Sequence, residues 1–374
     1  HKRILSLRYD FNKCQLQRSK WLKCYAFVIN VLLVLLIGVV VELISGFEPY
    51  YENNAIIKDI VKLDTWIRFV ALLLTMIFRC RSEKQLMLII GDMQKLLCNT
   101  RLAASNYDID QKCCCLLNLK FITMAYQSFT TALSIVLAAP ALSLDVVFLI
   151  WFFVTTQNVI YCVIFHYYAA LWYCCKCFCS LNRQLLLIYV ALSNNCNRLD
   201  ALATDVQEIA SLHWKLGDFV LRLNACYEKQ ILTVLLTFIL NNIVFGYSVA
   251  IEASGSFRAT VSTSYTLAFG AISFAIVLLD LFLQYWIASS WNVTYALVDW
   301  CNDFSSRVNL TFLLQCNLFA SQLLIRPLHI RIAGMFVLDN RAGFALAVFT
   351  FQHILVLLQF DMEYQLGLTR RSKL

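Results

Sequence analysis

The chain has 374 residues, of which 60% are hydrophobic and 14% carry a charged side chain. A soluble fold could not bury this much apolar surface, and the composition is typical of proteins that cross a membrane several times. The formal net charge is +8, and most of the basic residues fall between the apolar runs rather than inside them. We expect a polytopic membrane protein, with no nucleic-acid partner.

A basic arm at residues 1–24 precedes the first apolar run. Seven runs are long enough to cross about 30 Å of hydrocarbon as helices. The sequence therefore predicts an all-α fold with seven transmembrane helices and an intracellular amino terminus. The predicted spans are Tyr25–Ser45, Ile60–Phe78, Leu119–Ala139, Val146–Trp172, Gln230–Ile251, Ala259–Ile287 and Ala342–Gln365.

Several helical patterns continue past the membrane. The pattern of the fourth span runs on toward Leu199, and Ala201–Lys229 has apolar residues at three- and four-residue intervals. Arg79–Asn118 is predicted as a basic loop with amphipathic helical character, and Asn292–Ala320 as a further long helix. The predicted divisions are a cytosolic arm at 1–24, transmembrane helices with cytosolic extensions and a ligand pocket at 25–289, cytosolic anchor helices at 290–340, and a last span with an extracellular tail at 341–374.

The basic residues orient the spans. The only basic residues in three short connections are Lys58 and Arg258. These connections are Gly46–Asp59, Pro140–Asp145 and Glu252–Arg258. Cytoplasmic loops are enriched in Lys and Arg, so these three connections are predicted to lie outside the cell. The amino terminus is then cytoplasmic and the carboxyl terminus extracellular.

None of the 16 cysteines lies in the three outer connections. Clusters at Cys113–Cys115 and Cys174–Cys179 fall on the cytoplasmic side, where thiols stay reduced. Cys174 and Cys177 have CxxC spacing, but no second pair or nearby His completes a zinc site. We therefore favour reduced thiols, or palmitoylation at the inner membrane edge, and expect no metal and no cofactor.

The sequence lacks the motifs of two large functional classes. It has no Gly-rich phosphate loop, nucleophile elbow or HExxH motif, so it is not predicted to be an enzyme. Seven spans also suggest a G-protein-coupled receptor. The sequence has no Asp/Glu-Arg-Tyr triplet after the third span and no Asn-Pro-x-x-Tyr in the seventh, and its charges predict the opposite orientation.

The last span carries its polar residues in a line. Gln352, Val356, Gln359 and Glu363 fall at i, i+4, i+7 and i+11, so they share one face of a helix. Amide side chains in a spanning helix need partners or water. A single Gln could serve as a hydrogen bond between helices. The whole line favours the wall of an aqueous pore.

The segment before this span, Ser321–Asp339, reads SQLLIRPLHIRIAGMFVLD. With its Gln, Pro, Gly and Phe at recognisable intervals, it resembles the carboxyl-terminal signature of insect gustatory receptors. The span itself resembles the family motif of Thr-Tyr, five hydrophobic residues and Gln-Phe. Ile354–Leu358 are followed by Gln359 and Phe360, whereas Gln352 and His353 occupy the Thr-Tyr positions.

This resemblance implies a tetrameric, ligand-gated, non-selective cation channel similar to the insect odorant receptors. The seventh helix of each subunit would line a central pore, and the inner helices would form an anchor domain with most of the subunit contacts. By resemblance, Gln359 and Phe360 belong at the pore constriction. The pore-lining candidates are Gln352, Val356, Gln359, Phe360 and Glu363.

The ligand site implied by the family is a pocket within each subunit that opens outward, so the outer halves of the spans supply the candidates. Aromatic walls with a few amides and hydroxyls suit a mid-sized amphipathic molecule, which favours bitter tastants over sugars. Packing in the core is the alternative role for each residue. The candidates are Trp66, Arg68, Gln127, Phe129, Thr131, Trp151, Phe152, Thr155, Asn158, Asn241, Asn242, Phe245, Thr263, Tyr265 and Phe269.

The sequence thus predicts a gustatory receptor in the plasma membrane, placed by resemblance in the sensory dendrite of taste neurons. Its expected partners are a small-molecule tastant, membrane lipid, permeating cations and related receptors in a homo- or hetero-tetramer. Two alternatives stay open: a non-conducting accessory subunit of a heteromeric channel, and a secondary transporter. The paired repeats with broken helices that mark many transporters are not found in the sequence.

Overall fold

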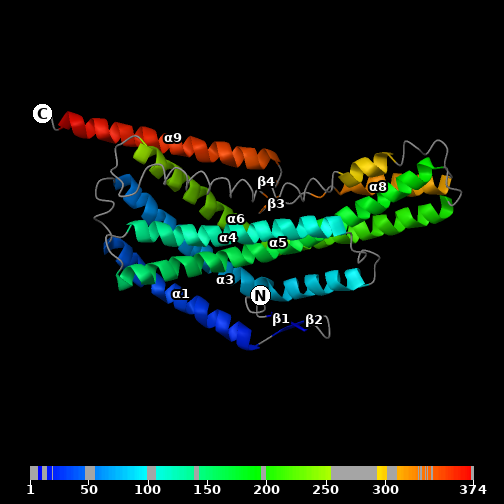
Figure 1. The fold of residues 1–374 in the computed structure, drawn as a ribbon, viewed down its shortest axis with the longest axis horizontal. Helices are drawn as coiled ribbons and strands as arrows, with labels where there is room; N and C mark the ends of the chain where they lie inside the picture. The colour runs from blue at the N-terminus through cyan, green and yellow to red at the C-terminus, as the bar shows by residue number, and fades with distance from the viewer. Residues whose placement is uncertain are drawn as a thin grey trace.

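The fold is helical, with two short hairpins. A computed structural model describes residues 7–10, 15–18, 20–46, 55–98, 107–138, 143–194, 199–253, 293–300, 310–326, 328, 331–332, 334, 336–337 and 340–371. Within these residues the long helices lie side by side along the longest axis of the molecule (Figure 1). They are α1 (Lys20–Gly46), α3 (Ala55–Cys98), α4 (Tyr107–Ala138), α5 (Leu144–Ser193), α6 (Leu199–Ala253) and α9 (Asn340–Arg371).

Helices α5 and α6 are far longer than a membrane is thick. They have 50 and 55 residues, which corresponds to about 75 Å and about 83 Å at about 1.5 Å per residue. Ser143 starts α5, because its side-chain oxygen accepts a hydrogen bond from the N–H of Val146 at 3.4 Å and satisfies a donor of the first turn. The helix predicted to continue past the fourth span does so, to Ser193.

Helix α3 is longer than the second predicted span. It runs without interruption from that span to Cys98, through half of the stretch Arg79–Asn118 that was predicted as a basic loop with amphipathic helical character. Leu86, Ile89 and Met93 recur at helical spacing and are buried against α5 and α6. Burial of this apolar face keeps the residues helical although the segment is rich in basic side chains.

The largest hydrophobic core lies in the half of the molecule that contains α8 (Leu310–Ile325) (Figure 1). It joins α3, α5, α6, residues 297–298, α8 and the segment after it. A smaller core in the other half joins α1, α3 and α5 through Leu33, Leu72 and Phe152. The fully buried side chains of the large core include Tyr167, Phe178, Leu181, Leu185, Leu216, Leu223, Phe312 and Phe319.

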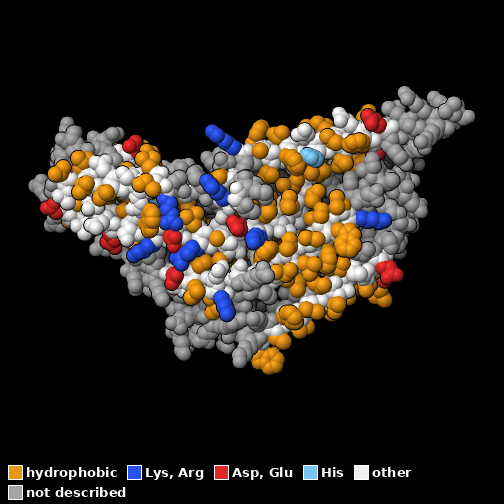
Figure 2. Space-filling model, turned by 180° about the vertical axis from the view of Figure 1, so that it is seen from behind, with side chains coloured by type: hydrophobic (Ala, Val, Ile, Leu, Met, Phe, Trp, Pro, Cys, Tyr) orange, Lys and Arg blue, Asp and Glu red, His pale blue; other side chains and the backbone are white. Residues whose placement is uncertain are grey.

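The surface separates into an apolar half and a charged half. On the face in Figure 2, hydrophobic side chains cover the half toward the carboxyl end of α9, and most Lys, Arg, Asp and Glu side chains gather toward the other half. Large side chains in the predicted spans are exposed, among them Leu35 at 71% and Phe129 and Phe351 at 62% each. An apolar surface of this extent is expected where helices face lipid.

In the described part of the chain, two segments are long and apolar enough to cross a membrane, namely α5 and Phe344–Glu363 within α9. Shorter apolar helical stretches occur at Phe27–Val40, Thr65–Phe78 and Leu310–Ile325. The sixth predicted span, Ala259–Ile287, lies outside the described residues. Part of the helix predicted at Asn292–Ala320 is present, as residues 293–300 and the first part of α8.

Two antiparallel hairpins were not predicted. β1 (Leu7–Asp10) pairs with β2 (Gln15–Arg18) in the basic arm. β3 (Arg331–Ile332) pairs with β4 (Phe336–Val337) just before α9, with Ile332 opposite Phe336. Gly334 has φ of 71° between these strands, a backbone conformation that residues with a Cβ rarely adopt. This requirement explains the Gly of the segment Ser321–Asp339.

Candidate functional site

A cavity lies between α1, α3, α5 and α6. Its empty space, which includes an open mouth, is about 670 Å³. The lining residues are Ile37, Val40, Thr65, Arg68, Phe69, Leu72, Phe152, Phe153, Thr156, Gln157, Ile160, Tyr161, Val234 and Thr237.

The cavity wall is mainly apolar, with a few polar groups. Arg68 places its guanidinium carbon 6.0 Å from the centre of the Phe153 ring. The amide of Gln157 donates a hydrogen bond to the hydroxyl of Tyr161 at 2.9 Å. Thr156 and Thr237 donate their hydroxyls back to the carbonyl oxygens four residues earlier, at 2.8 and 3.0 Å. Aromatic rings with an amide, hydroxyls and one guanidinium can bind an amphipathic molecule that carries hydrogen-bonding groups.

The structure brings two of the predicted ligand-pocket residues to this cavity, Arg68 and Phe152. Trp66, Phe129 and Trp151 are exposed, at 52%, 62% and 46%. The other described candidates are half-buried and do not line the cavity: Thr155, Asn158, which accepts a hydrogen bond from Ser128 at 2.9 Å, and Asn242. The candidates whose side chains lie outside the described part are Gln127, Thr131, Asn241, Phe245, Thr263, Tyr265 and Phe269.

Sequence reasoning missed most of the cavity wall on α5. Besides Phe152, it selected Trp151, Thr155 and Asn158, which share one face, whereas Phe153, Gln157 and Tyr161 lie about 130° farther around the helix, on the side that lines the cavity. The spacing i, i+4, i+8 of an aromatic, an amide and a phenol was a usable signal. It did not decide which of the two faces points inward, because both contain aromatic and polar residues.

Helix α9 packs on α6 through one face only. Thr350 and Asp361 are buried, at 7% and 6% exposure, and the side chain of Ile354 contacts α6 at Gly246. Residues 350, 354, 357 and 361 follow helical spacing and define this packed face.

The predicted stripe lies on the opposite face of α9. Gln352, Val356, Gln359 and Glu363 are all exposed, and Phe360 beside them is 60% exposed. Each is about half a helical turn away from the residues that contact α6. In one copy of the chain the stripe is therefore available to other subunits or to an aqueous path.

A family profile for 7tm chemosensory receptors matches residues 4–364 of the chain. The chain belongs to this family. It is thus a multi-pass membrane chemoreceptor rather than an enzyme, and the all-helical, seven-span fold predicted from the sequence is confirmed.

Two solved structures are similar to this chemoreceptor. They are the insect olfactory receptor OR5 from Machilis hrabei in complex with eugenol, with a TM-score of 0.60, and a second structure of the same receptor, with a TM-score of 0.62. Each match is 13% identical in sequence and covers 91% of this chain and 90% of the other. At this identity the likeness is one of fold. No curated protein matches the chain.

The segment that resembles the gustatory signature runs alongside α6. The side-chain amide of Gln322 donates to the carbonyl of Ala210 at 3.2 Å. Farther along, the amide of Asn224 donates to the carbonyl of Arg331 in β3 at 2.6 Å, and the carbonyl oxygen of Asn224 accepts from the hydroxyl of Tyr167 at 3.0 Å. Helix α6 therefore holds the chain that leads into α9 over about 20 Å of its length.

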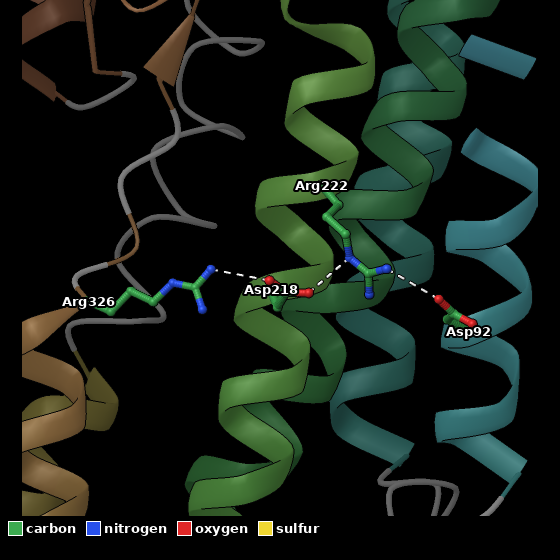
Figure 3. Close-up of polar contacts among 4 residues, drawn as sticks. All are labelled: Asp92, Asp218, Arg222 and Arg326. Atoms are coloured by element: carbon green, nitrogen blue, oxygen red, sulfur yellow. Dashed lines mark hydrogen bonds and ion pairs between the residues drawn. The ribbon is translucent and has the colours of Figure 1, made fainter. Parts of the chain in front are cut away.

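Ion pairs add to this attachment (Figure 3). Asp218 of α6 accepts from Arg326 at 3.2 Å and from Arg222 at 2.9 Å, and Arg222 also contacts Asp92 of α3 at 3.2 Å. Arg326 lies over the ring of Trp214, 4.6 Å from its centre. The side chains of all four charged residues are more than a third exposed, so each pair is worth little stability alone. The network connects α3, α6 and the end of α8.

His213 is buried in the same half of the chemoreceptor. Its ring packs edge-on against Phe178 and Phe319, with centroids 5.0 and 5.5 Å away. Burial lowers the pKa of His213 from its ordinary 6.5 to about 3, because the apolar surroundings disfavour the charged ring. The imidazole is therefore neutral at physiological pH.

Proposed function

We propose that this chemoreceptor is a ligand-gated, non-selective cation channel of the insect taste-receptor type, assembled as a tetramer with α9 around a central pore. The observation that supports this proposal is the exposure of Gln352, Val356, Gln359 and Glu363 on the face of α9 that points away from α6. Amide groups within an apolar span cannot face lipid without a large free-energy penalty. Water in a pore between copies of α9 would satisfy them.

Helix α6 contacts both the proposed ligand cavity and the proposed pore helix α9. Val234 and Thr237 of α6 line the cavity, and Gly246 of the same helix contacts Ile354 of α9. The two positions on α6 are about 14 Å apart along one continuous helix. A ligand that shifts or rotates α6 would therefore displace the packed face of α9 as well.

The cavity favours a small amphipathic ligand. The described residues of its wall provide rings, hydroxyls, one amide and one guanidinium, without the convergent set of polar groups that sugars need. A bitter compound is therefore the preferred tastant. The olfactory receptor of similar fold was solved in complex with eugenol, which agrees with a small-molecule ligand.

The proposed location is the plasma membrane of taste-neuron dendrites, with the amino terminus and the anchor helices at 290–340 in the cytosol. The sequons at Asn292 and Asn309 test this orientation, since glycosylation occurs only on the extracytoplasmic side. Thr294 is buried and donates to Asn182 at 2.7 Å, whereas Thr311 is exposed, so the second sequon is the better reporter. Glycosidase should leave the mobility unchanged; a shift that Asn309→Gln removes would contradict the orientation.

Recording currents from membrane patches of cells that express the chain tests the proposal. We expect unitary cation currents evoked by members of a panel of bitter compounds, with little response to sugars. Saturating fluxes without unitary openings would favour a secondary transporter. Currents that require a co-expressed relative would favour a non-conducting accessory subunit.

A further inference from the structure

The cysteines of the described part of the chain fall into two groups. Three thiols are exposed, those of Cys24, Cys114 and Cys115. The others are buried or half-buried: Cys174, Cys175, Cys177, Cys179, Cys226 and Cys316. Exposure decides which thiols an enzyme can reach, so only the first group is open to modification in the folded protein.

All three exposed thiols lie at the inner ends of predicted spans. Cys24 directly precedes the first span, and Cys114 and Cys115 lie one turn before the third. Lys23 precedes Cys24, and Lys112 lies just before the second group, as expected for segments next to an anionic membrane surface.

The packing of α4 on α5 supports the placement of Cys114 and Cys115 at the inner edge of the membrane. Lys120 of α4 places its amine 4.6 Å from the centre of the Tyr168 ring on α5. The two helices are antiparallel, so five residues from this contact Cys115 and Tyr173 reach the same level. Tyr173 is 42% exposed, and exposed Tyr side chains are enriched at membrane–water interfaces.

Each of the three cysteines is followed, on the same side of its helix, by exposed apolar residues of the predicted span. Seven residues after Cys114 and Cys115, on the same faces of α4, come Phe121 and Ile122, with 52% and 61% exposure. On α1, Val28 is 56% exposed one turn after Cys24. A hydrocarbon chain attached to any of these sulfurs can extend along apolar side chains toward the middle of the bilayer.

We propose that Cys24, Cys114 and Cys115 are S-acylated by long-chain acyl groups. The donor is a long-chain acyl-coenzyme A at the cytoplasmic face. The Cys sulfur forms a bond to the acyl carbonyl carbon, the bond from that carbon to the sulfur of coenzyme A breaks, and the Cys proton passes to the released thiol. No electrons are exchanged with an oxidant or reductant. Several chains on one protein attach its inner edge stably to lipid.

Thioester counting tests the inference on the full chain in insect cells. Free thiols are blocked with N-ethylmaleimide, thioesters are cleaved with neutral hydroxylamine, and the new thiols are coupled to maleimide–polyethylene glycol. We expect Cys24→Ser, Cys114→Ser and Cys115→Ser each to remove one hydroxylamine-dependent mass step, and the triple variant to lose three. Mass spectrometry of the tryptic peptide 113–120 should find acyl groups on Cys114 and Cys115.

Cys316→Ser is the matched control, because this thiol is 1% exposed and should leave all three steps in place. The absence of hydroxylamine-dependent steps would overturn the proposal. So would an unchanged number of steps in the triple variant, or a step that disappears in Cys316→Ser. Acylation is measured without ligand or current, so the result is independent of whether the chain conducts.

Discussion

Gly246 of α6 lies directly against Ile354 of α9. A Cβ on Gly246 would lie 3.2 Å from Cγ1 of Ile354 and closer still to its Cδ1. The missing side chain thus lets the helix that lines the cavity approach the helix that carries the polar stripe. Any change at this contact should alter how movement of α6 reaches α9.

Gly246→Ala should therefore destabilise the receptor by about 1–3 kcal/mol through overpacking, although Ala favours a helix. Ile354→Val, which removes Cδ1, should relieve part of this effect, so that the double variant is more stable than the sum of the single effects predicts. Thermal unfolding of the solubilised protein and ligand dose–response curves both measure the coupling.

Gly91→Ala is the control, because nothing lies within 4 Å of the Cβ position at this helical glycine. This variant should be neutral or stabilised by up to about 1 kcal/mol. Equal effects of Gly246→Ala and Gly91→Ala would show that the close approach of α6 and α9 has no energetic consequence.

Gln359 should govern permeation if its face lines the pore. Gln359→Glu should strengthen cation preference and divalent block, and Gln359→Leu should reduce conductance, because the amide helps to replace the hydration of passing ions. Gln352→Leu should have a smaller effect in the same direction. Leu357→Ile, on the half-buried side of α9, serves as the control. Parent-like single-channel currents in both Gln359 variants would assign the stripe to packing.

Phe153 and Phe129 form a matched pair for locating the ligand. Phe153 lines the cavity, whereas Phe129 on α4 is exposed and does not. Phe153→Leu should weaken the apparent ligand affinity about fivefold, which corresponds to about 1 kcal/mol of lost ring contact. Phe129→Leu should leave the dose–response curve unchanged. The reverse pattern would place the ligand site at α4 instead of this cavity.

His213 should make stability depend on pH. Its folded pKa of about 3 is below the ordinary 6.5, so between these values the unfolded chain binds the proton more strongly. Stability is therefore full above pH 6.5 and falls as the pH is lowered, by about 2 kcal/mol at pH 5. His213→Phe, which cannot titrate, should lose less Tm between pH 7 and pH 5. Parallel curves for the two proteins would contradict the role of burial.

The pair Asp218–Arg326 should contribute modestly to holding the end of α8 on α6. A double-mutant cycle with Asp218→Asn and Arg326→Gln should give a coupling free energy of about 0.5 kcal/mol, because both side chains are more than a third exposed. Salt should reduce this coupling. Glu208→Gln, on the same helix but outside this network, should not couple to Arg326→Gln. A salt-independent coupling would mean that the pair is shielded from water.

The sequence by itself determined where most of the long helices lie and which residues share a helix face. Apolar periodicity is a local property, so it located most of the long helices and placed Gln352, Val356, Gln359 and Glu363 on one face of α9. It predicted amphipathic helical character between Arg79 and Asn118, but not that α3 continues unbroken to Cys98, because burial of that apolar face depends on α5 and α6. The role of the stripe in permeation stays a prediction.

Tertiary structure decided which face meets which neighbour. Phe153 rather than Trp151 lines the cavity because α5 is rotated by its packing against α1, α3 and α6, and no local pattern on α5 specifies that rotation. The partners Gly246 and Ile354 are 108 residues apart, and Asp218 and Arg326 are likewise separated by 108. Spacing along a chain fixes which side chains share a helix face, whereas the contact that this face makes depends on helices remote in sequence.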